Sequence, residues 1–179
     1  MILLIGPSAV GKTEVANELY RLYHLRKVVT HTTRPMRINE VIDIDYHFVS
    51  VEAFLKMQKD NEFIETTFYN NHYYGTSKKE LGENKVLIVD PHGKDIFLAL
   101  KDPHIVIFYL KADNETRKKR MIERGDSLIT INNRLEKDLL WFNKETEFGA
   151  NYILDTTSYS LEELASKIYT LYTNYLKTH

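Results

Sequence analysis

A glycine-rich segment near the start of the chain has the residue types and spacing of a phosphate-binding loop: Gly6-Pro7-Ser8-Ala9-Val10-Gly11-Lys12-Thr13. The glycines let the backbone fold closely around an anion, because they carry no Cβ. The N–H groups of such a turn, and those of a helix that follows it, point at phosphate oxygens. Lys12 would reach the outer phosphates, and the Thr13 hydroxyl is a hard ligand for Mg2+. The segment therefore predicts a site for a nucleoside triphosphate with Mg2+.

A carboxylate, Asp90, closes the apolar run of residues 86–89, which we interpret as a central strand. The carboxyl ends of parallel strands meet at one edge of a sheet, so Asp90 is expected near the phosphate loop. There it could hold Mg2+ through water beside Thr13. The alternative is a helix or turn cap before Pro91. The intact phosphate loop favours the metal role.

Basic residues are concentrated in residues 117–134, which we interpret as part of a mobile lid at about residues 117–140. Arg120 and Arg124 are one helical turn apart and share a face. Two guanidinium forks there could clamp a triphosphate and spread the charge of a transition state. The alternative is a solvated basic face that pairs with Glu115 or Glu123. The phosphate loop in the same chain favours the lid.

A second set of phosphate-binding residue types lies in and after a loop that contains Pro35. Arg34 and Arg37 are a pair that could grip another phosphate. The hydroxyl groups of Tyr46 and Tyr74 could add donors, although ordinary burial is the alternative for each tyrosine alone. The chain therefore has candidates for two phosphate sites.

The elements that must position these residues alternate between strands and helices. Apolar strands are predicted at residues 27–30, 86–90, 105–110 and 151–154, with helices at 12–22, 95–100, 114–124, 128–144 and 161–176. This alternation predicts an α/β fold of the P-loop type, a parallel sheet with helices on both faces. Residues 31–77 differ, since short strands rich in Tyr, Phe and Thr surround an Asn70-Asn71 turn. We interpret them as a small β-rich insertion in a core of residues 1–30 and 78–179.

Composition excludes several classes of function. The chain has 179 residues, which suits one α/β domain, and its net charge of -1 gives no global indication of nucleic acid or an anionic membrane. It has no cysteine, which excludes disulfides and thiol nucleophiles. No signal peptide and no apolar segment of about 20 residues is apparent. We expect a cytoplasmic protein without nucleic-acid or membrane partners, and the sequence leaves the oligomeric state open.

Several motifs follow one another along nearly the whole chain: Gly6-Pro7-Ser8-x-x-Gly11-Lys12-Thr13, Thr32-Thr33-Arg34-Pro35-x-Arg37-x-x-Glu40, Asp45-Tyr46-His47-Phe48-Val49-Ser50, Glu62-Phe63-Ile64-Glu65, Tyr73-Tyr74-Gly75-Thr76-Ser77 and Arg120-x-x-x-Arg124-Gly125. In this order they resemble the guanylate kinase family, whose members move a phosphoryl group from ATP to GMP. The resemblance implies an ATP-dependent nucleoside monophosphate kinase. It also implies that the β-rich insertion binds the nucleoside monophosphate and that a helical lid covers the donor.

By position, the resemblance implies a role for each matching residue. GMP or dGMP would be held by residues that bind its phosphate or face its base: Thr30, Arg34, Arg37, Tyr46, Glu65, Tyr74 and Thr76. The transferred phosphoryl group would be surrounded by the catalytic cations Lys12, Arg120, Arg124 and Arg134. ATP would lie on residues 6–13, with Asp155 near its adenine, where the family usually has Asn.

The role of Glu65 also has a chemical argument of its own. Guanine presents two adjacent donors, N1–H and the 2-amino group, which one carboxylate accepts as a bidentate pair. Adenine has an acceptor at N1 and no 2-amino group, so it would leave a buried Glu65 unpaired. Such a mismatch gives discrimination on the order of 10⁴-fold or more. The alternative for Glu65 is a surface position on a strand.

The chain departs from the family pattern at Ile88, where the family usually has a second acid that contacts the acceptor. A related P-loop kinase with a different phosphorylated acceptor is therefore one alternative. Another is an inactive guanylate-kinase-like module that binds peptides, but such modules usually lack the loop and lid cations that this chain has. Ala9 replaces a frequent glycine, and we expect the loop to tolerate it.

Overall fold

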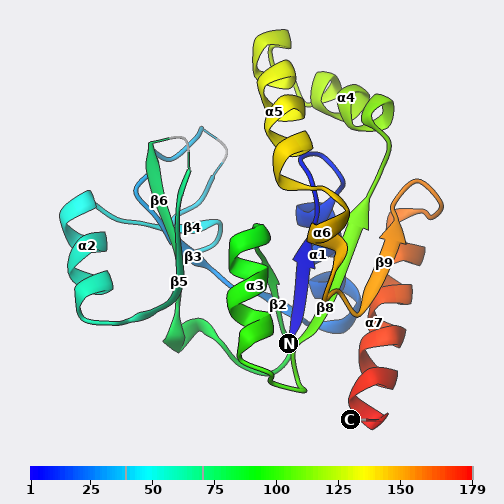
Figure 1. The fold of residues 1–179 in the computed structure, drawn as a ribbon, viewed down its shortest axis with the longest axis horizontal. Helices are drawn as coiled ribbons and strands as arrows, with labels where there is room; N and C mark the ends of the chain where they lie inside the picture. Colours follow the sequence, from blue (N-terminus) through cyan, green and yellow to red (C-terminus); the bar gives the residue numbers. More distant parts are fainter. Residues whose placement is uncertain (39, 70, 179) are drawn as a thin grey trace.

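A parallel sheet of five strands forms the centre of the computed structural model, which describes residues 1–38, 40–69 and 71–178 (Figure 1). Its order is β2-β7-β1-β8-β9, with β1 in the middle. The strands span Arg26–Lys27 (β2), Lys85–Ile88 (β7), Ile2–Ile5 (β1), Val106–Lys111 (β8) and Tyr152–Asp155 (β9). All the pairings are parallel, so every carboxyl end lies at the same edge. The predicted α/β fold is confirmed.

Helices cover both faces of this sheet, because its strands are apolar on both sides. On one face, α1 (Lys12–Tyr23) and α7 (Leu161–Thr178) pack against the even-numbered residues of β1, Ile2 and Leu4. On the other face, Phe97 of α3 (Pro91–Ala99) packs against Leu3 and Ile5. The phosphate loop leaves β1 between these two layers, so a buried strand anchors it.

A second sheet lies beside the central one, on the left in Figure 1. Its order is β4-β3-β6-β5, with strands Tyr46–Phe48 (β4), Thr30–Thr32 (β3), His72–Ser77 (β6) and Phe63–Tyr69 (β5). Helix α2 (Val51–Lys59) packs on it through Phe54, whose ring lies 4.6 Å from the ring of Phe63. A short 3-10 helix, η1 (Lys78–Glu80), follows β6. Asn70 of the predicted Asn70-Asn71 turn lies outside the described residues.

Two helices after β8 stand above the carboxyl edge of the central sheet, at the top of Figure 1. They are α4 (Asn114–Glu123) and α5 (Leu128–Trp141), and Asp113 and Ser127 cap their N-termini. A short helix, α6 (Lys144–Glu147), leads from α5 towards β9. Helices α4 and α5 therefore form a hairpin over the phosphate loop, and the role of this hairpin as a mobile lid stays a prediction.

Three predicted elements are wrong in their bounds. The strand predicted at residues 27–30 is divided, because the chain leaves the central sheet after Lys27 and joins the second sheet at Thr30. The helix predicted at residues 95–100 begins at Pro91, since Asp90 caps it. The helix predicted at residues 128–144 ends at Trp141, and Asn143 caps a new helix with a capping box.

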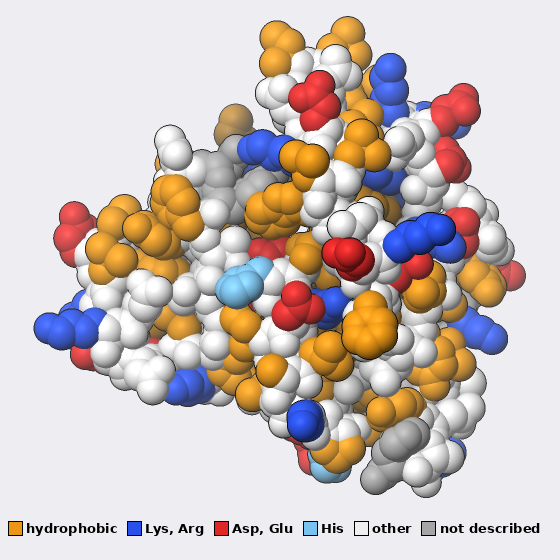
Figure 2. Space-filling view, in the orientation of Figure 1, with side chains coloured by type: hydrophobic (Ala, Val, Ile, Leu, Met, Phe, Trp, Pro, Cys, Tyr) orange, Lys and Arg blue, Asp and Glu red, His pale blue; other side chains and the backbone are white. Residues whose placement is uncertain are grey.

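Exposed apolar side chains are spread over the face drawn in Figure 2 among charged ones, both on the second sheet and on the lid. Scattered residues of this kind are normal for a folded domain. Among the described residues, no helix is long and apolar enough to cross a membrane.

The second sheet contains a buried histidine, His31, which is 5% exposed and whose ring lies 4.6 Å from that of His47. The pKa of His31 is lowered to about 4, mainly by burial and also by the charges of His47 and Lys79, against the opposing charges of Glu80 and Asp43. An unfolded histidine binds its proton near pH 6.5. The stability gained by keeping His31 neutral is therefore complete above about pH 6.5 and is lost as the pH falls towards 4.

Between about pH 6.5 and pH 4, we expect the unfolding free energy of the wild type to fall more steeply than that of His31→Phe. The two slopes should differ by no more than about 1.4 kcal/mol per pH unit, which is the limit for one titrating group. The measurement is urea unfolding of the wild type and the variant at several pH values, read as the difference between them. His24→Asn, at an exposed position with left-handed backbone, is the matched control. Parallel pH curves for wild type and His31→Phe would contradict the assignment.

Candidate active site

A cleft of about 1100 Å³ lies where the central sheet, the second sheet and the lid meet. Most of the predicted site residues line it: Gly6, Ser8, Ala9, Val10, Gly11, Lys12, Thr13, Thr30, Arg34, Arg37, Tyr46, Glu65, Tyr74, Asp90, Arg120, Arg124 and Arg134. Pro7, Thr76 and Asp155 do not line it. The fold therefore gathers residues from distant parts of the sequence around one cavity.

The phosphate loop depends on residues without a side chain at two points. Gly6 has φ +150°, and a Cβ there would meet the carbonyl oxygen of Leu110 at 2.1 Å. Gly11 has φ +98° and stands at the N-cap of α1, where it offers no side chain to the first N–H groups of the helix. These N–H groups are open to an anion at the positive end of the helix dipole. Ala9 also has a positive φ, +61°, so the loop carries one strained residue.

Lys12 folds back over the loop. Its Nζ donates to the carbonyl oxygens of Gly6 at 2.6 Å and Pro7 at 2.9 Å. Burial lowers the pKa of Lys12 to about 8, with the charges of Asp138 and Arg117 acting in opposite directions. The ammonium group therefore lies at the loop and titrates much closer to neutral pH than an ordinary lysine.

Thr13 is exposed in the cleft wall, as a ligand for a nucleotide-bound metal should be. Among the described residues, no group of three or more His, Asp or Glu side chains is arranged to hold a metal ion by itself. Mg2+ that binds together with a nucleotide needs few protein ligands, because phosphates and water complete its coordination. The Thr13 hydroxyl fits such a site.

Asp90 performs the capping role that the sequence left as its alternative. Its Oδ1 accepts a hydrogen bond from the N–H of Gly93 at 2.7 Å, at the start of α3. The pKa of the Glu65 carboxyl is raised by burial and also by the charge of Asp90. Asp90 therefore borders the side of the cleft that holds Glu65, and its contact with a metal stays a prediction.

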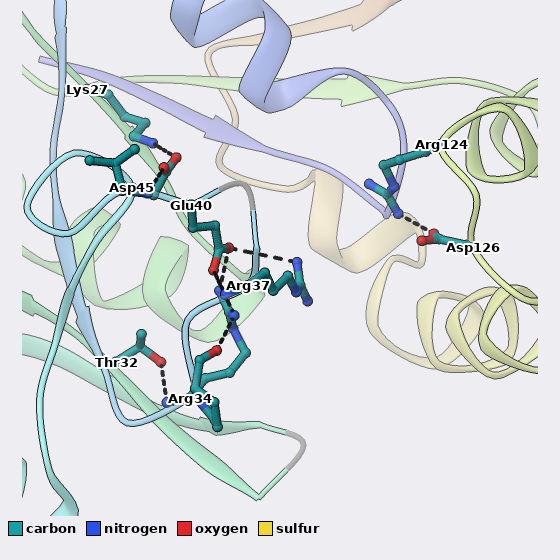
Figure 3. A network of polar contacts seen from close by, with 10 residues as sticks. Lys27, Thr32, Arg34, Arg37, Glu40, Asp45, Arg124 and Asp126 are labelled. Atoms are coloured by element: carbon teal, nitrogen blue, oxygen red, sulfur yellow. Dashed lines mark hydrogen bonds and ion pairs between the residues drawn. The ribbon is translucent and has the colours of Figure 1, made fainter.

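The lid arginines reach the cleft from both helices. Arg120 donates to the carbonyl oxygen of Ala9 at 3.3 Å and to Thr156 Oγ1 at 3.1 Å, so α4 contacts the loop directly. Arg124 pairs with Asp126, while Arg134 of α5 lies in the cleft wall. Figure 3 shows Arg124 and Asp126 on the opposite side of the view from Arg34 and Arg37.

The arginines of the second sheet's loop share one carboxylate. Arg34 makes two hydrogen bonds to Glu40, at 2.7 and 3.0 Å, and the Glu40 side chain also accepts from the N–H of Arg37 at 2.8 Å (Figure 3). The Arg34 guanidinium lies 5.3 Å from the centre of the Tyr46 ring, and Tyr46 contacts Tyr74 edge to face. Arg34 is therefore paired with an internal carboxylate, and its contact with a phosphate stays a prediction.

Glu65 is aimed into the cleft by an irregularity in β5. The register of β5 against β6 shifts between Phe63 and Glu65, which places Glu65 opposite Thr76. Thr76 Oγ1 donates to Glu65 Oε1 at 2.5 Å, and Thr76 is fully buried behind it. Burial raises the pKa of the Glu65 carboxyl above its usual range. Glu65 is thus a half-buried acceptor in the cleft rather than a surface residue.

Asp155 does not itself line the cleft. Its Oδ1 accepts from Thr157 Oγ1 at 2.6 Å, and it is Thr156, the next residue, that lines the cleft beside Arg120. The structure therefore brings the loop after β9 to the cleft through Thr156. The adenine contact of Asp155 stays a prediction.

Two functional candidates were missed by the sequence reasoning. Arg117 was placed in the basic run without a role, and Asp138 was not selected at all. Both are buried, at 5% and 8% exposure, and both bind Ser8 of the phosphate loop. Helical spacing could have indicated both residues. Arg117 lies one turn before Arg120 and Asp138 lies one turn after Arg134, so each shares a helix face with a predicted site residue.

Comparison with known proteins gives one consistent result. A family model described as guanylate kinase matches residues 1–171. The guanylate kinase of Chromohalobacter salexigens is 30% identical over an alignment of 177 positions, and the alignment covers 94% of this chain and 82% of that protein. The guanylate kinase of Mycoplasma genitalium is 32% identical over an alignment of 181 positions, which covers 93% of this chain and 73% of that protein.

Solved structures share the fold. The guanylate kinase of Anaplasma phagocytophilum aligns with a TM-score of 0.71 at 24% identity, over 96% of this chain and 82% of that one. The YorR protein of Bacillus subtilis, solved in complex with phosphorylated GDP, aligns with a TM-score of 0.57 at 16% identity, over 100% of this chain and 99% of that one.

The lowered pKa of Lys12 predicts that affinity for ATP with Mg2+ depends on alkaline pH. Only the ammonium form attracts phosphates, so the dissociation constant should be steady below about pH 8 and rise above it, by up to roughly tenfold per pH unit. Isothermal titration calorimetry from pH 7 to above pH 9 measures this. Lys12→Ala should bind more weakly at every pH, with a flatter profile. An equal slope in both proteins would assign the dependence to another group.

Proposed function

The chain belongs to the guanylate kinase family, and from this premise we propose how its cleft performs the reaction. The protein is an ATP-dependent nucleoside monophosphate kinase that transfers the γ-phosphoryl group of ATP to GMP. One observation supports the assignment of the site above others. The same cleft is lined by a phosphate loop, by an arginine and tyrosine cluster and by a half-buried acid, Glu65.

On the donor side, we propose that the triphosphate of ATP lies on residues 6–13. Lys12 would exchange its bonds to the carbonyl oxygens of Gly6 and Pro7 for the phosphate oxygens. Mg2+ bound with ATP, held by Thr13 and through water by Asp90, would neutralise charge on the phosphates. Asp155 keeps its proposed place near the adenine, with Thr156 nearer to the cleft.

On the acceptor side, the phosphate of GMP would take the place that Glu40 occupies at Arg34. Arg37 and the hydroxyl groups of Tyr46 and Tyr74 would complete its binding. Thr30, at the first position of β3, lines the same part of the wall. These residues belong to the unit of residues 31–77, or border it, and we propose that this unit binds the nucleoside monophosphate.

The base of GMP is assigned to Glu65 and Thr76. Thr76 holds one oxygen of Glu65 from behind, which fixes the carboxylate for the N1–H and 2-amino donors of guanine. A half-buried carboxylate with a raised pKa gains more from two donors than an exposed one, because water does not compete. This is the physical basis that we propose for choosing guanine over adenine.

The transfer itself requires positioning and charge stabilisation. An oxygen of the acceptor phosphate forms a bond to the γ-phosphorus, and the bond from that phosphorus to the β–γ bridging oxygen breaks, which releases ADP and GDP. The attacking oxygen already carries negative charge, so no general base is needed. Lys12, Arg120, Arg124 and Arg134 would offset the charge of the transition state. The lid and the second sheet would exclude water, which otherwise would hydrolyse ATP.

Ile88 supports one alternative, a P-loop kinase with a different phosphorylated acceptor. Its half-buried side chain lines the cleft where a second acid is usual in the family, and it offers no acceptor to a base. The inactive binding module is disfavoured, because the loop and the lid arginines all line the cleft. A cytoplasmic location remains a prediction.

An acceptor panel tests the function. With ATP and Mg2+, transfer to GMP and dGMP should exceed transfer to AMP, CMP, UMP and ribose phosphates by on the order of 10⁴-fold in kcat/KM. A preference for another acceptor would support the alternative kinase. No transfer to any acceptor, together with no ATP binding by calorimetry, would support the inactive module.

Glu65→Gln should raise the KM for GMP on the order of 10²-fold while the affinity for ATP changes less than about twofold. The amide can accept one guanine donor, but its own N–H group would face the other. Steady-state kinetics and ATP calorimetry separate the two effects. Glu62→Gln makes the same chemical change outside the cleft walls and is the matched control. Equal losses for GMP and ATP would place Glu65 outside the acceptor site.

A further inference from the structure

Ser8 of the phosphate loop is hydrogen-bonded to one residue from each of the helices α4 and α5. Arg117 of α4 donates from Nε to the Ser8 carbonyl oxygen at 2.8 Å. Asp138 of α5 accepts from the Ser8 N–H at 2.9 Å and from Ser8 Oγ at 3.2 Å. Arg117 and Asp138 also form an ion pair with each other. All three polar groups of Ser8 are therefore engaged, and the two helices are joined at the same point.

This ion pair is buried, with side chains 6% and 9% exposed. Buried pairs are weak evidence for a stabilising role, since well-packed apolar residues of similar volume often stabilise a fold as well or better. Their attested advantage is conformational specificity, because charged partners accept few alternative geometries. The Arg117 fork is also held by Asn114 at 3.0 Å, so its orientation is determined from more than one side.

The grip acts next to the strained part of the loop. Ala9, the neighbour of Ser8, has φ +61°, a conformation that residues with a Cβ rarely adopt. Strained backbone persists only where its surroundings hold it. Ser8 is held by Arg117 and Asp138, and the carbonyl oxygen of Ala9 accepts from Arg120 at 3.3 Å. The lid helices thus hold two consecutive residues of the loop.

The same grip sets the position of the lid arginines. Arg117 stands one turn before Arg120 and two turns before Arg124 on α4, and Asp138 stands one turn after Arg134 on α5. The helices that carry these arginines are therefore tied to the loop within two turns of each of them. Displacement of the tie would move the arginines relative to the triphosphate, and misplacement by about 1 Å costs roughly 10²-fold in rate.

We propose that Arg117 and Asp138 are positioning residues that clamp Ser8, hold the phosphate loop in its binding conformation and register the lid arginines against it. The inference rests on the proposed function, which supplies the reaction that the clamp serves. The clamp acts on the donor side alone, since the acceptor residues belong to the second sheet.

The opposite role for Asp138 predicts the opposite change in ATP affinity, so the direction of that change decides between the two roles. A carboxylate on a loop N–H group could act as a substitute anion that ATP must displace. Asp138→Asn would then strengthen ATP binding. A clamp predicts the reverse, because the amide has one acceptor oxygen where the carboxylate has two, and it lacks the charge that holds Arg117.

The experiment compares Asp138→Asn with the double variant Arg117→Met/Asp138→Leu. In Asp138→Asn, we expect kcat to fall roughly 10- to 100-fold and the ATP dissociation constant to rise roughly tenfold, with GMP affinity within about twofold of wild type. The melting temperature should fall as well, since Arg117 loses its buried partner. In the double variant the melting temperature should recover while kcat and ATP affinity stay low, because Ser8 remains unclamped.

Controls separate a clamp from general destabilisation. Ile168→Val, on the buried face of α7, lowers stability without touching the cleft, and its kcat should match wild type well below the melting temperature. Recovery of both stability and kcat in the double variant would overturn the proposal, as would wild-type kinetics or tighter ATP binding in Asp138→Asn.

The outcomes also distinguish this proposal from the function on which it rests. Transfer to GMP by the wild type tests the proposed function. ATP calorimetry on the variants tests the clamp, and it needs no acceptor. A wild type that binds ATP but transfers to no nucleotide would refute the function, and the ATP affinities of the variants would still decide the clamp.

Discussion

The mutual repulsion of cations is the constraint on which this site depends. The cleft gathers a lysine and several arginines, and in the structure most of them are matched to an internal oxygen. Lys12 bonds to the carbonyl oxygens of its own loop, Arg34 to Glu40 and Arg124 to Asp126. Each of these partners offers what a phosphate offers, so positive charge can be concentrated in the folded protein before any nucleotide arrives. Phosphate oxygens then replace internal oxygens, and the cations need little rearrangement.

The fold distributes these charges over three bodies that approach one another only at the cleft. The central sheet holds the phosphate loop, the second sheet and its loop hold Arg34 and Arg37, and the helical hairpin holds Arg120, Arg124 and Arg134. Figure 1 shows these three parts of the fold. Under the proposed function, this separation would let two anionic substrates bind to different surfaces, and closure of the hairpin would exclude water, which favours transfer over hydrolysis.

Local chemistry explains what the sequence could predict. The phosphate loop was recognisable because its glycines, Lys12 and Thr13 act within one turn of the chain, and the apolar runs gave the parallel sheet. The division of residues 27–30 between two sheets was not visible, because the run stays β-branched as the chain crosses over. Arg117 and Asp138 are 21 residues apart, and only the packing of α4 on α5 makes them partners. The start of α3 differs from the prediction because Asp90 was assigned first to the end of a strand and its capping role was only the alternative, although Asp90 and Pro91 together begin the helix.

Gly6 couples ligand binding to the integrity of the sheet. A Cβ at Gly6 would clash with the carbonyl oxygen of Leu110 on β8. Both residues lie one position beyond the last β1–β8 pair, which is Ile5 with Tyr109. The loop can keep this shape only while β8 stays in register, so separation of β1 and β8 abolishes the nucleotide site. By mass action, a nucleotide that binds only the intact site then raises the unfolding free energy of the whole central sheet. Cellular nucleotide concentration thereby becomes part of the folding equilibrium of this chain.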